Sequence, residues 1–182
     1  DAVYKDTKLP INEKTDAVPT TLHGLMHVTR ETIFSSFFDK NMLIIRPTLI
    51  YGEKDPHNGY GPNSFIRLAK KNLNIKLFGK GEERRDHINI NNVVSIIFDL
   101  IKKNKSGIFN LCTGNVISFD NLAKKIIKII KSKSKIIYTK RNGPMHHLGL
   151  RQFDIKKLKK NNFKYEISTI EKVINKNFIK KY

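Results

Sequence analysis

Short apolar runs alternate with stretches of helical periodicity along this chain. MLII at 42–45 and IFNLCT at 108–113 read as strands, and the continuous MLII run suits a strand buried on both faces of a parallel sheet. Around them, apolar residues recur at helical spacing over 20–38, and 92–103 is apolar on most sides, which predicts a buried helix. Strands that alternate with helices indicate an α/β fold.

The remaining segments continue this alternation. Further strands are expected at 2–4, 75–78, 86–90 and 135–139, and a further helix over 63–71. Ser118 is a suitable N-cap for the next helix. Ser168 and Glu171 form a capping-box pattern before a last amphipathic helix. The apolar residues of that last helix are Ile170, Val173, Ile174 and Phe178.

The composition is that of an ordinary globular protein, with 39% hydrophobic and 28% charged residues. No run of about 18 apolar residues occurs, so no membrane partner is expected. Cys112 is the only cysteine, which excludes an internal disulfide and favours a reduced, cytoplasmic setting.

Basic residues are concentrated in the second part of the chain. The net charge is +19, and residues 101–182 carry 21 lysines and arginines against four acidic residues. Such a surplus can mark a phosphate-rich partner such as nucleic acid. We favour compositional drift instead, because most of these lysines fall on helix faces that water would cover in any case. The segment also has no recognisable nucleic-acid-reading motif.

Four stretches together resemble one enzyme family. RPTLIYGEKDP at 46–56 resembles a strand and loop written R-P-x-N-V-Y-G-P, and LFGKGEERRDHINI at 77–90 resembles G-x-G-x-x-x-R-D-[FHW]-[IV]. The stretches at 108–126 and 141–160 match the segments that follow. These patterns are those of the extended short-chain dehydrogenase/reductase family, the NAD-dependent epimerases and dehydratases that act on nucleotide sugars.

The resemblance implies a fold and a division into domains. We expect the C-terminal part of a Rossmann-type doubly wound parallel sheet, plus a smaller α/β substrate-binding region. Residues 1–52 would hold the last strands and the active-site helix of the dinucleotide-binding domain. Residues 53–182 would form mainly the substrate-binding region, with some segments returning to the Rossmann domain.

The glycine-rich turn that holds a dinucleotide pyrophosphate, G-x-G-x-x-G, does not occur in this sequence. DAVYKDTKLPINE at 1–13 resembles the segment just after the family's catalytic Ser or Thr. We therefore expect this chain to be the C-terminal part of a larger enzyme. Residues 1–182 alone are not expected to bind NAD specifically, although NAD or NADP is the cofactor that the resemblance implies.

Two histidines take the place of the family's catalytic pair. When the helix is aligned on Pro19 and Glu31, His23 falls at the tyrosine and His27 at the lysine of Y-x-x-x-K. An imidazole can move a proton near neutral pH without a cationic neighbour, so catalysis by His23 is chemically coherent. Three alternatives stay open: structural histidines on the flank of the helix, loss of catalysis, and a metal pair. A zinc site would need a third ligand, so no metal is expected.

The resemblance also assigns cofactor and substrate residues. His27 takes the position that holds the nicotinamide ribose, and Pro47 and Thr48 fall where the family approaches the nicotinamide. Leu49 replaces the usual substrate-contacting asparagine. Expected substrate-binding residues are Asn63, Arg67, Arg85 and Arg141, and the last two fall where the family grips the substrate diphosphate. Guanidinium groups match phosphate oxygens bidentately, although Arg85 could instead form an ion pair with a neighbouring acidic residue.

Three functions of different classes follow, in order of preference. The first is NAD(P)-dependent modification of a nucleotide sugar by epimerisation, dehydration or simple hydride transfer. The second is a catalytically silent protein that binds a nucleotide sugar or a dinucleotide, which the two histidines and Leu49 would suit. The third is a basic nucleic-acid-binding module. A homodimer stays open.

Overall fold

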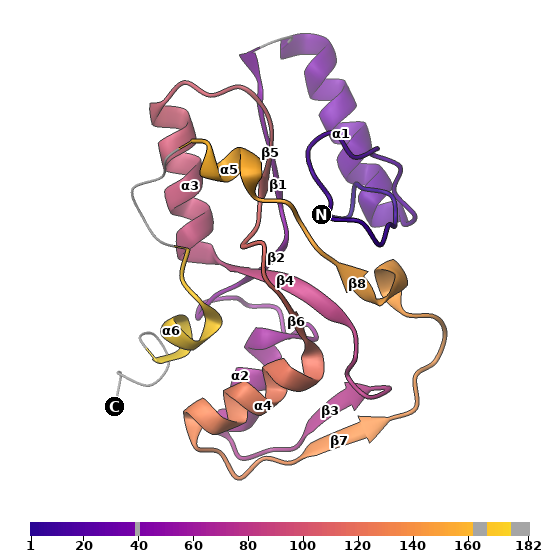
Figure 1. Ribbon diagram of the computed structural model, residues 1–182, viewed down its shortest axis with the longest axis vertical. Coiled ribbons are helices and arrows are strands. Elements are labelled where there is room, and N and C mark those ends of the chain that lie inside the picture. The colour runs from indigo at the N-terminus through magenta and orange to yellow at the C-terminus, as the bar shows by residue number, and fades with distance from the viewer. Residues whose placement is uncertain (39–40, 162–166, 176–182) are drawn as a thin grey trace.

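The computed structural model describes residues 1–38, 41–161 and 167–175. It confirms the α/β alternation (Figure 1). The helices are α1 (Leu22–Phe38), α2 (Pro62–Lys70), α3 (Ile90–Lys102), α4 (Phe119–Ile130), α5 (Lys156–Lys159) and α6 (Ile170–Ile174), with a 3-10 turn, η2, at His146–Gly149. The strands are β1 (Leu43–Pro47), β2 (Leu49–Tyr51), β3 (Ile75–Phe78), β4 (Arg84–Asn89), β5 (Gly107–Leu111), β6 (Val116–Ser118), β7 (Ile136–Thr139) and β8 (Leu150–Arg151).

Parallel pairing dominates the sheets. β1 pairs with β5, with Ile45 opposite Phe109, and β3 pairs with β7. β4 is central to the third sheet: it runs parallel to β2 and β8 and antiparallel to β6. In Figure 1 the β1–β5 pair runs between α1 and α3, as in a doubly wound sheet with helices on both faces.

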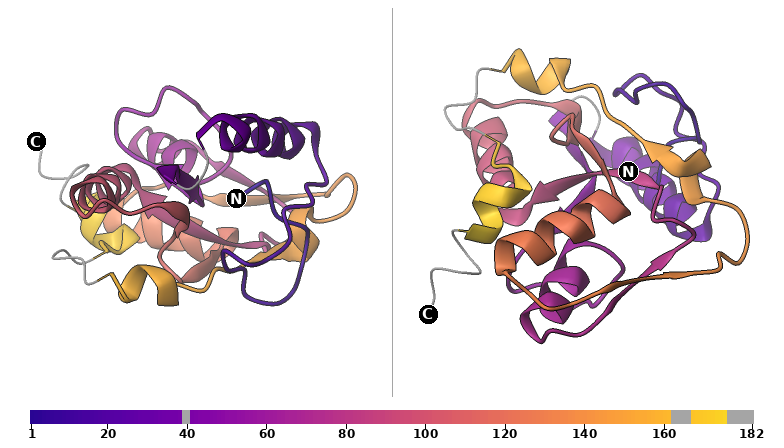
Figure 2. Two further views of the ribbon diagram at one scale, coloured as in Figure 1. Left: turned by 90° about the horizontal axis from the view of Figure 1, so that it is seen from above. Right: turned by 60° about the horizontal axis from the view of Figure 1, so that its bottom comes forward.

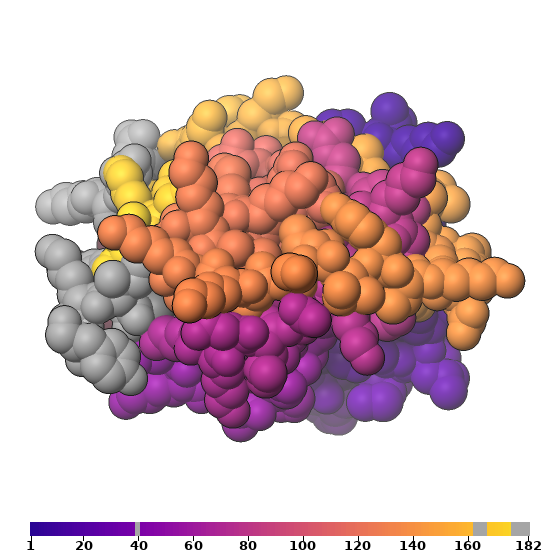
Figure 3. Space-filling view, turned by 90° about the horizontal axis from the view of Figure 1, so that it is seen from below, coloured from indigo at the N-terminus to yellow at the C-terminus, as the bar shows by residue number. Residues whose placement is uncertain are grey.

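Two hydrophobic cores lie on either side of β4. One gathers under β1 and β5 and includes Tyr4, Ile88, Leu100 and Phe109. The other lies among α2, β3, α4 and α6 and includes Phe65, Leu77, Leu122 and Ile174. The chain passes between them repeatedly, since residues 153–158 return to the first core and α6 returns to the second. Figures 2 and 3 show the elements around the second core, where α4 and β7 (orange) adjoin α2 and β3 (purple).

The predicted helix N-caps are partly correct. The Ser118 hydroxyl accepts a hydrogen bond from the Asn121 backbone N–H at 3.2 Å, as expected for the cap of α4. The prediction of Ser168 at the start of α6 is wrong: Thr169 is the cap and accepts from the Lys172 N–H. Phe178, predicted for the apolar face of this helix, lies outside the described residues.

Three other predictions are wrong in detail. Residues 2–4 form a turn rather than a strand, closed by a hydrogen bond from the Tyr4 N–H to the Asp1 carbonyl. β1 is not fully buried: Leu43, Ile44 and Ile45 keep partial exposure. The helix α3 is buried on one face only. Its other face exposes Ile90, Val94, Phe98 and Ile101.

No helix in the described ranges is both long enough and apolar enough to cross a membrane.

Candidate active site

The two histidines lie one turn apart on α1 and face each other. Their ring centroids are 4.6 Å apart and the ring planes are nearly perpendicular. His23 is exposed and His27 is partly buried. Burial lowers the pKa of His27, and the neighbouring His23 and Arg30 lower it further, so His27 is neutral at neutral pH. Within the described part of the chain, no group of three His, Cys, Asp or Glu residues could hold a metal ion.

The start of α1 is fixed against the first residues of the chain. Gly24 is buried, and a Cβ atom at this position would lie 2.2 Å from the carbonyl oxygen of Ala2. The helix therefore needs glycine directly after His23 in order to approach this backbone. Thr21 supports the turn, since its hydroxyl accepts from the Gly24 N–H at 3.1 Å.

An ion pair attaches the same helix to β1. The Arg46 Nε donates to Glu31 at 3.0 Å, and a second guanidinium nitrogen contacts the other carboxylate oxygen at 2.5 Å. The Arg46 guanidinium also lies 4.8 Å from the centre of the Tyr4 ring. Bidentate pairs of this kind have little freedom, so α1 keeps a fixed orientation on the sheet.

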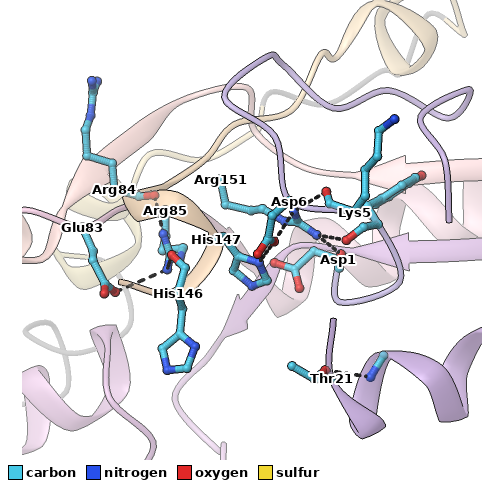
Figure 4. A network of polar contacts seen from close by, with 12 residues as sticks. Asp1, Lys5, Asp6, Thr21, Glu83, Arg84, Arg85, His146, His147 and Arg151 are labelled. Atoms are coloured by element: carbon cyan, nitrogen blue, oxygen red, sulfur yellow. Dashed lines mark hydrogen bonds and ion pairs between the residues drawn. The ribbon is translucent and has the colours of Figure 1, made fainter. Parts of the chain in front are cut away.

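Arg151 fixes the segment that packs on α1. Its side chain is fully buried and donates to the carbonyl oxygens of Asp1, Tyr4 and Lys5 at 2.7, 2.9 and 3.0 Å. Asp6 completes the arrangement, 3.4 Å from the Arg151 guanidinium and 2.6 Å from the Nδ1 of His147 (Figure 4). The segment 1–6 is thus attached to β8 and to η2.

Arg85 and Arg141 come together on one carboxylate. Glu83 accepts from Arg85 at 3.3 Å and from Arg141 at 2.5 Å, although the two arginines lie on different segments. Arg85 also donates to the carbonyl of His146 at 2.8 Å, on the 3-10 turn that precedes β8. Figure 4 shows Arg85 turned toward Glu83 and His146, with Arg84 pointing away.

Asp86, which follows Arg85 in β4, contacts residues that follow the ends of both β1 and β5. Burial raises the pKa of Asp86 to about 6, although the carboxylate accepts hydrogen bonds from Thr113 and from the Gly114 N–H. The Asp86 carbonyl accepts from the Thr48 hydroxyl at 2.9 Å. Thr48 directly follows the last residue of β1 and so lies at the carboxyl end of this strand, the edge of an open α/β sheet at which ligands bind.

With this geometry established, comparisons with known proteins define the family. Residues 1–112 match the sequence model of the NAD dependent epimerase/dehydratase family, which is more than half of the chain.

The chain belongs to the NAD dependent epimerase/dehydratase family.

Individual relatives agree with this family. An ADP-L-glycero-D-manno-heptose-6-epimerase of Brachyspira hyodysenteriae is 38% identical over 91 residues, which cover 47% of this chain and 28% of that protein. A dTDP-D-glucose 4,6-dehydratase of Dictyostelium discoideum is 30% identical over 122 residues, which cover 65% of this chain and 28% of that protein.

The fold is also found among solved structures. The UDP-glucuronic acid 4-epimerase of Bacillus cereus, in complex with UDP-glucuronic acid and NAD, superposes with a TM-score of 0.78 at 18% identity. The match covers 94% of this chain and 55% of that one. The chain thus spans only part of the length of the proteins that it matches.

Not every residue that the family resemblance assigns to ligand binding lies with the arginines. Asn63 is buried: its amide donates to Asp55 and accepts from the Gly52 N–H at 3.2 Å. Arg67 donates to backbone carbonyls of the same loop, including that of His57 at 2.7 Å. Both side chains hold the loop that precedes α2, and their contact with substrate stays a prediction.

A cavity of about 670 Å³ lies elsewhere, between β6, α4 and residues 167–171. His87 contributes to its wall, and so does Arg84. The residues named for the family site do not line this cavity.

The family motifs did not point to two residues that organise this site. Arg151 lies within the matched stretch 141–160, yet its contacts with residues 1–6 depend on a tertiary arrangement that no local pattern reveals. Glu83 stands between two assigned motif positions. The one available signal was its place two residues before Arg85, which puts two alternate side chains on one side of an extended segment.

Proposed function

We propose that the complete protein is an NAD(P)-dependent enzyme that modifies a nucleotide sugar by epimerisation, dehydration or simple hydride transfer. The proposal rests on family membership together with one observation, the convergence of Arg85 and Arg141. The matched relatives are named for ADP-, dTDP- and UDP-linked sugars, which have a diphosphate in common. Two guanidinium groups in one place suit that diphosphate.

A continuous set of contacts connects these arginines with α1. Arg85 bonds the carbonyl of His146, and the next residue, His147, bonds Asp6. The segment that contains Asp6 also contains Ala2, against which Gly24 packs. We propose that a ligand whose diphosphate is held by the arginines has its sugar near the start of α1, where His23 lies.

The proposed roles follow from this arrangement. His23 would accept the proton of a sugar hydroxyl, and bound NAD(P) would supply the acceptor for the hydride of the carbon that bears this hydroxyl. Pro47 ends β1 and Thr48 follows it, at the edge where the nicotinamide would approach. His27 would face the ribose. Asn63 and Arg67 are proposed to contact the nucleotide. The cytoplasmic setting is part of the same proposal.

Turnover by the complete protein tests this function. The protein is incubated with NAD or NADP and with a panel of ADP-, GDP-, UDP- and dTDP-sugars. We expect conversion of at least one sugar. Chromatography of the products and the absorbance of the nicotinamide measure this conversion. Binding of a nucleotide sugar without conversion would favour the silent binding protein, which the His23, His27 and Leu49 exchanges suit. Binding of neither ligand would contradict both functions.

We also propose that α1 contributes to a homodimer. The helix exposes a large apolar surface formed by Leu22, Leu25, Met26, Ile33, Phe34, Phe37 and Phe38. Contiguous apolar surface of this kind is typical of an interface.

Phe37→Asp should turn the dimer into a monomer, because Phe37 is 78% exposed and would place a charge in an apolar contact. Sedimentation of the complete protein measures this. Ser35→Asp, which adds the same charge on another side of α1, is the control and should leave the dimer intact. A monomeric parent protein would contradict the proposal.

A further inference from the structure

Glu83 lies at the point where the two arginines meet. It directly precedes β4, and its side chain is only 8% exposed. One carboxylate oxygen contacts Arg141 and the other contacts Arg85. One negative charge thus faces two guanidinium groups, and one positive charge is left without compensation in this trio. In a phosphate site formed by two arginines, the phosphate takes the place between the guanidinium groups that Glu83 occupies here.

The other hydrogen bonds of the arginines go to backbone carbonyls, which orient the guanidinium groups without compensating their charge. Arg85 donates to the carbonyls of Arg84 and His146, and Arg141 donates to the carbonyl of Phe78. Glu82 lies 3.7 Å from Arg141 but is 45% exposed, so water screens that contact. The Nε of Arg141 is buried and makes no hydrogen bond in the described structure. A donor is therefore left over beside Glu83.

We propose that Glu83 is the resident counterion of this arginine pair and that the diphosphate of the substrate competes with it. This inference rests on the proposed function, since it takes Arg85 and Arg141 as the diphosphate ligands. Before the ligand binds, the carboxylate keeps two like charges close together. When the ligand binds, the phosphate oxygens take over donors that Glu83 held, so the affinity for diphosphate is lower than two arginines alone would give.

Glu83→Gln separates the two effects of the carboxylate. The amide keeps the size of the side chain but removes the charge. The unliganded variant should melt at a lower temperature than the parent, because the buried Arg85 and the partly buried Arg141 lose their counterion. Inorganic pyrophosphate and UDP should bind roughly tenfold tighter, because the competing charge is gone. The rise in melting temperature that these ligands cause should be larger in the variant.

Calorimetry and thermal melts of the full chain measure both effects, with pyrophosphate, ADP, GDP, UDP and dTDP as ligands and uridine as the uncharged control. Glu82→Gln is the matched control variant, since it removes the same charge from the neighbouring, more exposed residue. It should change neither quantity substantially.

The outcomes are distinguishable. If the parent binds none of the diphosphates, the proposed diphosphate site is wrong. If the parent binds but Glu83→Gln binds equally or more weakly, the site stands and the counterion inference is wrong. A variant that folds only with pyrophosphate present supports the inference, because the ligand has replaced the carboxylate. A variant that stays unfolded with pyrophosphate contradicts it.

Discussion

Replacing Arg85 with alanine should weaken the binding of a nucleoside diphosphate by about 1.5–3 kcal/mol, the range for hydrogen bonds to charged groups. This corresponds to a rise of roughly 10- to 150-fold in Kd. The side chain is buried and already held by the carbonyl of His146, so it presents its guanidinium in a fixed orientation. Arg141→Ala should have an effect in the same range, because its guanidinium meets the same carboxylate.

Arg84→Ala is the matched control for this prediction. Arg84 is adjacent to Arg85 in β4, but it is exposed and points away from Glu83 (Figure 4). Its removal takes the same charge from the protein and should change the Kd only slightly, especially at moderate salt. If Arg85→Ala and Arg141→Ala both leave the affinity unchanged, the diphosphate binds elsewhere in the protein.

The two arginines should not behave additively. They share Glu83, and residues with a common partner are energetically coupled. When Arg85 is removed, the Glu83 carboxylate pairs with Arg141 alone. The carboxylate then neutralises the charge of Arg141 more completely. The double variant should therefore lose less affinity than the sum of the two single losses.

Local sequence patterns were sufficient for the main alternation of strands and helices and for the arginine of β4. They did not predict the short elements β2, β6, β8 and α5. Strands and helices alternate as predicted, and the G-x-G-x-x-x-R-D pattern placed Arg85 beside a glycine-rich turn. Hydrophobic periodicity predicts helices and strands because the type of element depends on residues that are neighbours along the chain. The prediction of a strand at 2–4 failed because Tyr4 is buried for a tertiary reason: its hydroxyl donates to Asn110 and its ring lies against Arg46.

The contacts that assemble the site could not be derived from local patterns. Arg151 binds carbonyls about 150 positions earlier in the chain, and Arg141 reaches Glu83 across 58 positions. Such contacts depend on how β4, β8 and η2 are placed side by side. The sequence also allowed an ion pair between Arg85 and a neighbouring acidic residue. Arg85 does form this pair, with Glu83, and the same carboxylate also contacts Arg141.

Replacing His23 with alanine should reduce turnover of the complete protein by roughly 10²- to 10⁴-fold, the usual contribution of a positioned acid or base. His23 is exposed at the start of α1, and the packing of Gly24 on Ala2 fixes the backbone that carries it. His27 cannot act as the cationic lysine of the family does, because burial and neighbouring positive groups lower its pKa and keep it neutral. A catalytic His23 would therefore transfer the proton without electrostatic help from His27.

The pH dependence distinguishes a catalytic His23 from a helix-flank residue. A base is active when deprotonated, so turnover should rise with pH if an imidazole accepts the proton. His23→Tyr combined with His27→Lys should shift this profile while cofactor binding is retained. His57→Ala, a change at an 88% exposed histidine outside the site, is the control and should leave the profile unaltered. If His23→Ala changes neither the rate nor its pH profile, the two histidines are structural and another group carries the proton.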